Sequence, residues 1–293
     1  MSTKLAQITE ADIAAERARF PRAFSAAPAE RVRFWMTRAI AFGLVIYCLH
    51  RFDFFSRVFV DGTLNFGSVV AAQLFPPTGF DQLPLFLSSL GETLAMAFLG
   101  TLLGAIFAFP LGFCASKNMV RFRPAQFGMR RFADLLRAFD YLIWALIFVR
   151  AIGLGPLAGI MAIAIVETGT FIKLYSEAIE NLDRKQIDAI RASGGNGLHV
   201  IRFGVLPQVL PMMLSNTLYM FEHNTRSAAI LGIVGAGGIG FLLADRLRAY
   251  ELQEACLIIM LVVVAVYAID FLSRILRNRL IGDGSGSQTL TDT

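Results

Sequence analysis

The chain has 293 residues, of which 56% are hydrophobic and 17% are charged, and its formal net charge is +5 at pH 7. Soluble domains contain about 45–50% apolar and about 25% charged residues, so one soluble core could not cover this much apolar surface. The composition excludes an ordinary soluble domain and indicates an integral membrane protein. In such a protein the net charge is no sign of nucleic-acid binding, because the placement of Lys and Arg between spans matters more.

Apolar runs recur along the whole chain, and a helix needs about 20 mostly apolar residues to cross a bilayer. They predict an all-α, polytopic fold with about six transmembrane helices, at 34–55, 86–113, 138–152, 155–175, 206–223 and 252–272. The transmembrane domain is expected to cover 34–280. Residues 1–33 are expected to form a cytoplasmic N-terminal segment, and residues 281–293 a flexible cytoplasmic tail.

The second span contains Gly100 and Gly104, a GxxxG pattern. Small residues four positions apart lie on one face of a helix and let a neighbouring backbone approach closely. We therefore expect close helix packing at these two glycines.

Basic residues indicate the orientation, because cytoplasmic loops carry an excess of Lys and Arg. They gather before the first span, after the second, in the loop 176–205 and after the last span. Two cytoplasmic loops must be separated by an even number of crossings, so 138–175 should be a hairpin of two short helices. By the same parity, 226–248 should not be a further full span. It should dip in and return, or form broken backbone packed inside the protein.

This broken segment includes Gly235-x-Gly237-x-x-Gly240, which has the letters of the dinucleotide-binding fingerprint. The fingerprint requires a preceding strand and a soluble βαβ unit, whereas apolar membrane sequence lies on both sides here. An intramembrane nicotinamide enzyme is thus the weaker alternative. The three glycines are expected to let the backbone turn beside a translocation path. The sequence predicts no catalytic residues, no metal site and no cofactor, and it contains no GxxxxGK[ST] motif for ATP hydrolysis.

The stretch 175–207 is polar, although it lies between strongly apolar segments. It predicts a helix, a Gly-Gly turn at Gly194 and Gly195, and a second helix capped by Asn196. Pro207 then begins the next span, where its missing N–H costs little. A projecting helical hairpin suits docking of a soluble partner, and an ordinary solvated loop is the alternative.

This stretch resembles the EAA loop of binding-protein-dependent ABC importer permeases, whose pattern is E-A-A, three residues, Gly, nine residues, Ile, one residue, Leu-Pro. Asp188-Ala189-Ile190 stands in the place of E-A-A, and the spacing is kept throughout. Three letters depart from the pattern: Asp for Glu, Ile for the second Ala, and Gly204 at the Ile position. The resemblance implies that the loop 176–206 contacts a separate cytoplasmic ATPase through Asp188, Ala189, Ile190, Gly194, Gly195, Leu206 and Pro207.

Residues 88–118, 153–183 and 226–243 look like phosphonate importer permeases, which are relatives of the methionine-type permeases. This resemblance implies a multi-pass permease subunit of a bacterial inner membrane that moves phosphonate or a related phosphorus oxyanion. Its implied partners are a cytoplasmic ABC ATPase dimer, an extracytoplasmic substrate-binding protein and a second copy of the permease. A permease for another small solute such as methionine, a heterodimer, and an ion-gradient-driven transporter remain alternatives.

Ionisable residues within or beside the predicted spans are costly in lipid and usually face the protein interior or a water-filled path. Arg226, next to Asn224, is the expected cation beside an anion pathway, whereas Lys173 near a span end is expected to have a structural role. The residues expected along the path are Glu92, Glu167, Thr168, Asn224, Arg226, Gly235, Gly237 and Gly240.

Overall fold

The computed structural model describes residues 28–52, 54, 57–120 and 122–282, and every regular element in these ranges is a helix. The chain divides into two compact units, Met1–Ala71 and Ala72–Thr293. The first unit contains α3 (Pro28–Arg51) and α4 (Arg57–Val69), and the π-helical turn η1 (Val70–Leu74) lies at the junction. Most of the predicted terminal segments 1–33 and 281–293 lies outside the described residues.

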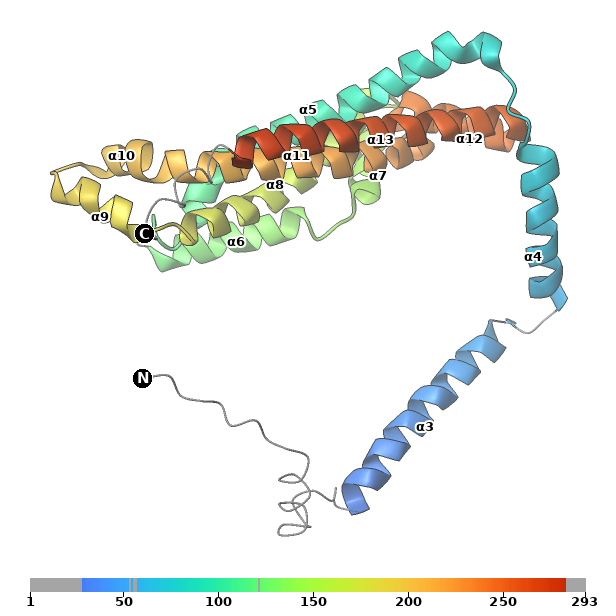
Figure 1. The fold of residues 1–293 in the computed structure, drawn as a ribbon, viewed down its shortest axis with the longest axis horizontal. Helices are drawn as coiled ribbons and strands as arrows, with labels where there is room; N and C mark the ends of the chain where they lie inside the picture. The colour runs from blue at the N-terminus through green and yellow to red at the C-terminus, as the bar shows by residue number, and fades with distance from the viewer. Residues whose placement is uncertain (1–27, 53, 55–56, 121, 283–293) are drawn as a thin grey trace, which may run out of the picture. The chain divides into compact units, whose positions relative to one another are not determined.

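The second unit is a helical bundle. In Figure 1 its long helices lie lengthwise beside one another, and α9 and α10 project from one end. Its elements are η2 (Phe80–Gln82), α5 (Leu83–Ala115), α6 (Arg123–Leu136), α7 (Tyr141–Ile152), α8 (Pro156–Glu180), α9 (Arg184–Ala192), α10 (Gly197–His199), η3 (Val200–Val205), α11 (Leu206–Leu231), η4 (Gly232–Ala236), α12 (Gly238–Arg248) and α13 (Leu252–Gly282).

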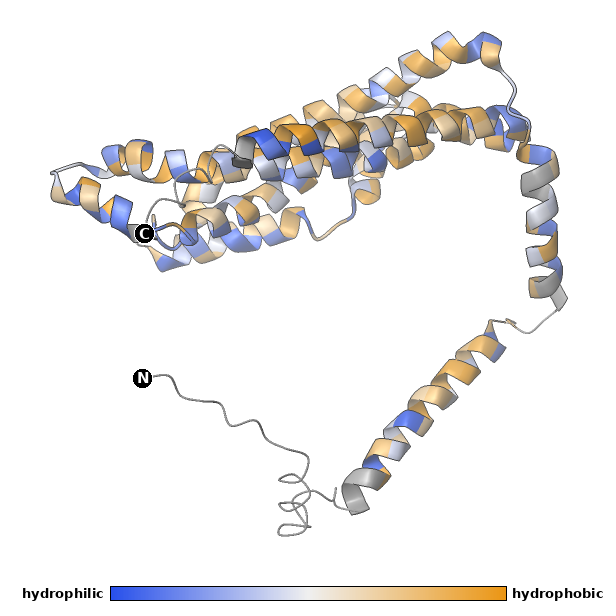
Figure 2. Cartoon of the chain, in the orientation of Figure 1, coloured by the Kyte–Doolittle hydropathy of each residue, from blue (hydrophilic) through white to orange (hydrophobic). Residues whose placement is uncertain are grey.

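Several helices are long and apolar enough to cross a membrane, which confirms the predicted all-α, multi-span class. Five such spans occur among the described residues: Val32–Arg51, Phe80–Ala115, Pro156–Glu180, Gly197–Ala236 and Leu252–Arg279. Figure 2 shows apolar residues along most of their length. The remaining predicted span, 138–152, corresponds to α7, which has only 12 residues. At 1.5 Å per residue it extends about 18 Å, too short to cross alone.

The helix α6 accompanies α7 along α8. Arg130 of α6 pairs with Glu180 at the end of α8, and Tyr141 of α7 is hydrogen-bonded to Glu167 near the middle of α8. From α6 to α7 the chain therefore runs antiparallel to α8. The basic stretch after the second span, expected to lie in a cytoplasmic loop, contains an amphipathic helix, α6, whose buried Ala133 packs against α8.

The helices α11 and α12 both run antiparallel to α5. Asn224 bonds to Thr101, the backbone N–H of Ile239 bonds to Thr93, and Arg246 bonds to Gln82. Because these partners move steadily toward the start of α5, α12 continues the course of α11. The two helices form one path interrupted at 232–237. This is the broken backbone expected for 226–248, and the chain turns back locally there, because Gly240 lies against the backbone of Ala229.

The helices α5 and α8 approach closely at glycines. A Cβ added at Gly100 would lie 2.7 Å from Cβ of Ile163, and one added at Gly104 would lie 2.6 Å from Cβ of Glu167. Real Cβ atoms do not approach this closely, so only glycine fits at these positions. The close packing predicted from the GxxxG pattern is confirmed.

Candidate functional site

The hairpin 176–206 has the helix–turn–helix form predicted for it. The side chain of Asp183 caps α9 by accepting a hydrogen bond from the Lys185 N–H at 3.0 Å. Gly194 ends α9 with φ at +83°, and Asn196 accepts a hydrogen bond from the His199 N–H at 3.0 Å. The second helix is not separate from the next span, because α10 has three residues and passes through η3 into α11.

Two positions that depart from the E-A-A pattern meet inside the hairpin. A Cβ at Gly204 would lie 3.0 Å from Cδ1 of Ile190, and one at Gly195 would lie 2.7 Å from Cγ2 of the same side chain. Ile190 thus packs over both glycines. The larger residue at 190 and the smaller one at 204 compensate each other in volume, a relation that the separate letters did not reveal.

The outer face of the hairpin combines charged and apolar side chains. Asp188 and Ala189 are exposed, and Asp188 lies 3.9 Å from Arg191, one turn along α9. Leu198 and Phe203 are 76% and 57% exposed. Apolar side chains gathered on a projecting polar element are typical of an interaction surface.

The two ends of the hairpin have different surroundings. A cavity of about 330 Å³ lies beside α9 and is lined in part by Lys117, Asp188 and Arg191. At the other end, Leu206 and Pro207 begin α11, with Leu206 half-buried and Pro207 exposed. The seven predicted coupling residues therefore belong to one hairpin and its junction with the bundle.

A buried polar network joins four helices in the interior of the bundle. Glu167 is fully buried, and its Oε1 accepts hydrogen bonds from the Tyr141 hydroxyl at 2.7 Å and from the Asn224 amide at 2.9 Å. The same amide donates to the Thr101 hydroxyl at 2.9 Å. The residues come from α7, α8, α11 and α5, so two predicted path residues lie in direct contact.

Two acceptor atoms of this network have no partner among the described residues. Oε2 of Glu167 and Oδ1 of Asn224 are buried, and neither has a hydrogen-bond partner within the described chain. Buried polar atoms are normally satisfied. The network is therefore a place where a proton, a water molecule or a polar group could bind.

Two other predicted path residues are engaged elsewhere. Thr168 donates a hydrogen bond to the carbonyl of Ala164 in its own helix at 2.6 Å. Arg226 lies 3.7 Å from Glu222 and 3.9 Å from Asp270, in an ion-pair network between α11 and α13. Arg226 therefore lies close to two carboxylates, and its position beside an anion path stays a prediction.

The glycine-rich stretch forms the interruption between α11 and α12. Gly235, Gly237 and Gly238 have φ values of +100°, +81° and +69°, a region that favours glycine. A Cβ at Gly240 would collide with the backbone carbonyl of Ala229. Helices flank this turn on both sides, so the strand that a nucleotide fingerprint requires does not precede it.

The start of α12 is capped by α5. Oε2 of Glu92 accepts a hydrogen bond from the N–H of Gly238 at 3.1 Å, and the Thr93 hydroxyl accepts one from the N–H of Ile239 at 2.8 Å. The first N–H groups of a helix lack partners inside the helix, and a carboxylate there is favourable. Glu92, predicted as a path residue, therefore holds the broken segment in place.

Comparisons with known proteins agree on one class. The family described as the inner membrane component of binding-protein-dependent transport systems matches residues 100–282. The putative phosphite transport system permease protein HtxC of Stutzerimonas stutzeri is 38% identical over 205 residues, which cover 70% of this chain and 72% of that protein. The phosphite transport system permease protein PtxC of the same organism is 33% identical over 240 residues, covering 82% and 86%.

A solved structure shares the fold. An inward-facing conformation of the MetNI methionine ABC transporter has a TM-score of 0.61 and 21% identity, and the match covers 69% of this chain and 99% of that chain. At this identity the likeness concerns the fold alone.

Proposed function

The chain belongs to the family of inner membrane components of binding-protein-dependent transport systems, and we propose that its cargo is phosphite, a phosphonate or a related phosphorus oxyanion. The protein is a multi-pass permease of the ABC importer class. The observation that carries the cargo proposal is its similarity, over more than two thirds of their lengths, to two relatives named for phosphite transport.

The hairpin 176–206 is proposed as the element that couples cargo movement to a separate cytoplasmic ATPase. Three features of the hairpin support this role: it projects from one end of the bundle (Figure 1), it exposes Leu198 and Phe203, and it borders a cavity beside Asp188. Closure of an ATPase dimer against this surface would move the hairpin as a unit, because Ile190 packs its two arms together.

The break between α11 and α12 is proposed as part of the gate of the cargo path. The carbonyl of Gly235 accepts a hydrogen bond from the N–H of Gly155, and Glu92 holds the start of α12. The interruption thus contacts the loop before α8 and the first third of α5, where a small change in backbone angles would displace α12. A second permease copy, an extracytoplasmic binding protein and cytoplasmic termini complete the proposed arrangement.

Uptake by the assembled transporter tests the cargo. Cells that produce the permease with its ATPase and binding protein would be supplied separately with labelled phosphite, methylphosphonate, phosphate and methionine. We expect ATP-dependent accumulation of at least one of the phosphorus oxyanions. Accumulation of methionine alone would refute the cargo assignment while leaving the family assignment intact.

Substitutions on the exposed face of the hairpin test the coupling role. Leu198→Asp and Phe203→Asp replace exposed side chains, so the fold should be preserved while the apolar contact with the ATPase is lost. We expect normal membrane insertion, reduced co-purification of the ATPase and loss of uptake. Tyr250→Asp, at an 86% exposed position outside the hairpin, is the control. Equal effects at Tyr250 and at the hairpin would contradict the assignment.

A further inference from the structure

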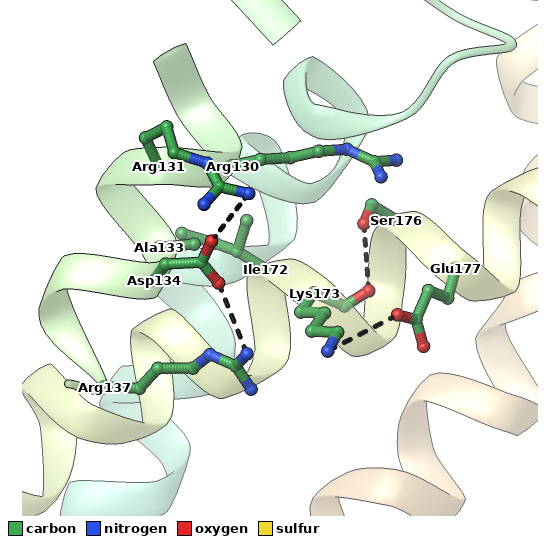
Figure 3. A pocket seen from close by; sticks show the side chains of 9 residues that line it. All are labelled: Arg130, Arg131, Ala133, Asp134, Arg137, Ile172, Lys173, Ser176 and Glu177. Carbon is green, nitrogen blue, oxygen red and sulfur yellow. Dashed lines mark hydrogen bonds and ion pairs between the residues drawn. The ribbon is translucent and has the colours of Figure 1, made fainter. Parts of the chain in front are cut away.

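A cationic pocket lies between α6 and the second half of α8. Two of its lining residues, Ser176 and Glu177, belong to the base of the hairpin 176–206, and none belongs to the buried network. It encloses about 270 Å³, slightly below the range of about 300–1,000 Å³ for ordinary ligand pockets, so a small ion or headgroup would suit it. Arg130 and Arg131 line it from α6, Arg137 lines it from the C-cap that follows α6, and Lys173 lines it from α8. Figure 3 shows their side chains around the pocket.

Asp134 lies between two of these arginines and holds both. Its two oxygens lie 3.1 Å from Arg131 and 3.3 Å from Arg137. Each guanidinium has five N–H donors in a fixed fork, and Asp134 engages one terminal nitrogen of each. The carboxylate therefore orients two guanidinium groups at the same pocket and leaves most of their donors available.

The other charges around the pocket leave an excess of positive charge. Arg130 is already held by Glu180 and by the carbonyl of Ala115, so it contributes less than its neighbours. Lys173 lies 4.0 Å from Glu177, beyond hydrogen-bond distance, and is about half exposed. The three less constrained cations, Arg131, Arg137 and Lys173, outnumber the two lining carboxylates, Asp134 and Glu177.

The floor of the pocket is apolar. Ala133 is 2% exposed and Ile172 is fully buried, and both face the packed interface of α6 and α8. Low polarity on one side strengthens the attraction between the cations and an anion in the pocket. Two forked guanidinium groups with an ammonium group match the several oxygens of a phosphoryl group, which arginine binds in a bidentate manner.

We propose that the α6–α8 pocket binds a phosphoryl oxyanion through the guanidinium groups of Arg131 and Arg137 and the ammonium group of Lys173. The group recognised is the same whether a free anion or the headgroup of an anionic lipid carries it. The site does not depend on the cargo proposed above, since none of its residues belongs to the predicted path.

The first test uses inorganic phosphate as the probe. Binding of labelled phosphate to the purified transporter would be measured by equilibrium dialysis for the native protein, Arg137→Gln, Lys173→Gln and Arg123→Gln. Arg123 is exposed on the same helix but does not line the pocket, so it is the matched control. We expect saturable binding that is weakened about tenfold or more in the two pocket variants, as loss of a charge-assisted hydrogen bond implies, and unchanged in the control.

The second arm distinguishes a lipid from a free ion. The same proteins would be placed in nanodiscs of phosphatidylcholine with or without phosphatidylglycerol, and retained lipid would be counted by native mass spectrometry. Retention of phosphatidylglycerol by the native protein and its loss in the pocket variants would identify a headgroup site. Phosphate binding without selective lipid retention would identify a free anion.

The proposal is overturned if the pocket variants and Arg123→Gln bind phosphate and retain phosphatidylglycerol equally. Arg137→Lys keeps the positive charge but loses the forked guanidinium, so it should bind phosphate at an intermediate level. Such an intermediate level would show that the weaker binding of the Gln variants does not come from misfolding. Uptake of phosphite would be measured on the same variants. Normal phosphite uptake by variants that no longer bind phosphate in the pocket would leave the proposed cargo unaffected. Phosphate binding in the pocket of a native protein that takes up no phosphite would contradict the cargo assignment alone.

Discussion

The side-chain amide of Asn224 donates a hydrogen bond to Glu167 across 2.9 Å, although the two residues are 57 positions apart in the chain. This contact joins α11 to α8 in the interior of the bundle, and the Tyr141 hydroxyl adds α7 to the same carboxylate. Glu167 is thus the common acceptor on which three helices converge.

Removal of that acceptor should destabilise the protein. Glu167→Ala leaves the Tyr141 hydroxyl and one N–H of the Asn224 amide unpaired in the interior, at a cost of about 1–3 kcal/mol for each group. Glu167→Gln keeps Oε1 and supplies an amide that could reach the unpartnered Oδ1 of Asn224, so its loss should be smaller. Thermal unfolding in detergent, followed by size-exclusion chromatography, would rank the variants. Glu177→Ala, at an exposed carboxylate of α8, is the control. An Ala variant as stable as the native protein would contradict this role.

Close packing of α5 against α8 predicts a steep cost at Gly104. Gly104→Ala would place a Cβ 2.6 Å from Cβ of Glu167, and relieving that contact should cost about 1–3 kcal/mol. Gly91→Ala lies on the same helix with nothing within 4 Å of its added Cβ, so it should be neutral. The two melting temperatures measured side by side would show the difference, and equal values would mean that the helices can separate freely.

The cap on α12 predicts a local effect at the broken segment. Glu92→Ala removes the acceptor of the Gly238 N–H, which should weaken the first turn of α12 by about 1 kcal/mol. Hydrogen–deuterium exchange of peptides covering 237–248 should therefore become faster. Glu92→Gln retains an acceptor oxygen without the charge and should show a smaller change. Unaltered exchange in both variants would show that Thr93 alone holds the helix start.

The volumes of Ile190 and Gly204 compensate each other, so a second substitution at Ile190 should rescue a larger residue at Gly204. Gly204→Ile should overpack the hairpin by about 1–3 kcal/mol, because even its Cβ would lie 3.0 Å from Cδ1 of Ile190. Adding Ile190→Ala gives the protein the residues of the family pattern at both positions, Ala at 190 and Ile at 204, and should recover stability and uptake. The double-mutant cycle should show coupling of about 0.5–3 kcal/mol. Strictly additive effects would indicate that the two side chains do not share one space.

The turn at Gly194 predicts a backbone effect without a steric one. Gly194 has φ at +83° and open space around its added Cβ, so Gly194→Ala should cost about 1–2 kcal/mol through the left-handed conformation alone. Gly197→Ala also meets open space, but Gly197 has no positive φ, and it should therefore be tolerated. Co-purification of the ATPase and ATP-dependent uptake would fall only in the Gly194 variant, and an equal fall in both would point away from the turn.

Local patterns in the sequence were sufficient for the class of fold and the position of the hairpin. Apolar runs mark membrane helices because a bilayer requires about 20 such residues, and Gly194, Asn196 and Pro207 act on the backbone within a few residues of themselves. The glycine-rich break was recognised in the same way, through the conformations that only glycine adopts readily. The prediction of a full span at 138–152 was wrong, because α7 has only 12 residues. The amphipathic helix α6, whose charges resemble those of a loop, lies along α8 together with α7.

The partners of the polar residues were decided by tertiary structure alone. Nothing near Glu92 in the sequence indicates that it caps a helix beginning at Gly238, and nothing near Arg226 indicates that Asp270 accepts its charge. Ile190 and Gly204 likewise differ from the family pattern without showing that they touch. A hydrogen bond, an ion pair or a shared volume depends on which distant residues the packed helices bring together. The sequence therefore determined which residues turn, cap and span, and the packing of α5, α8 and α11 determined what Glu92, Glu167 and Asn224 bind.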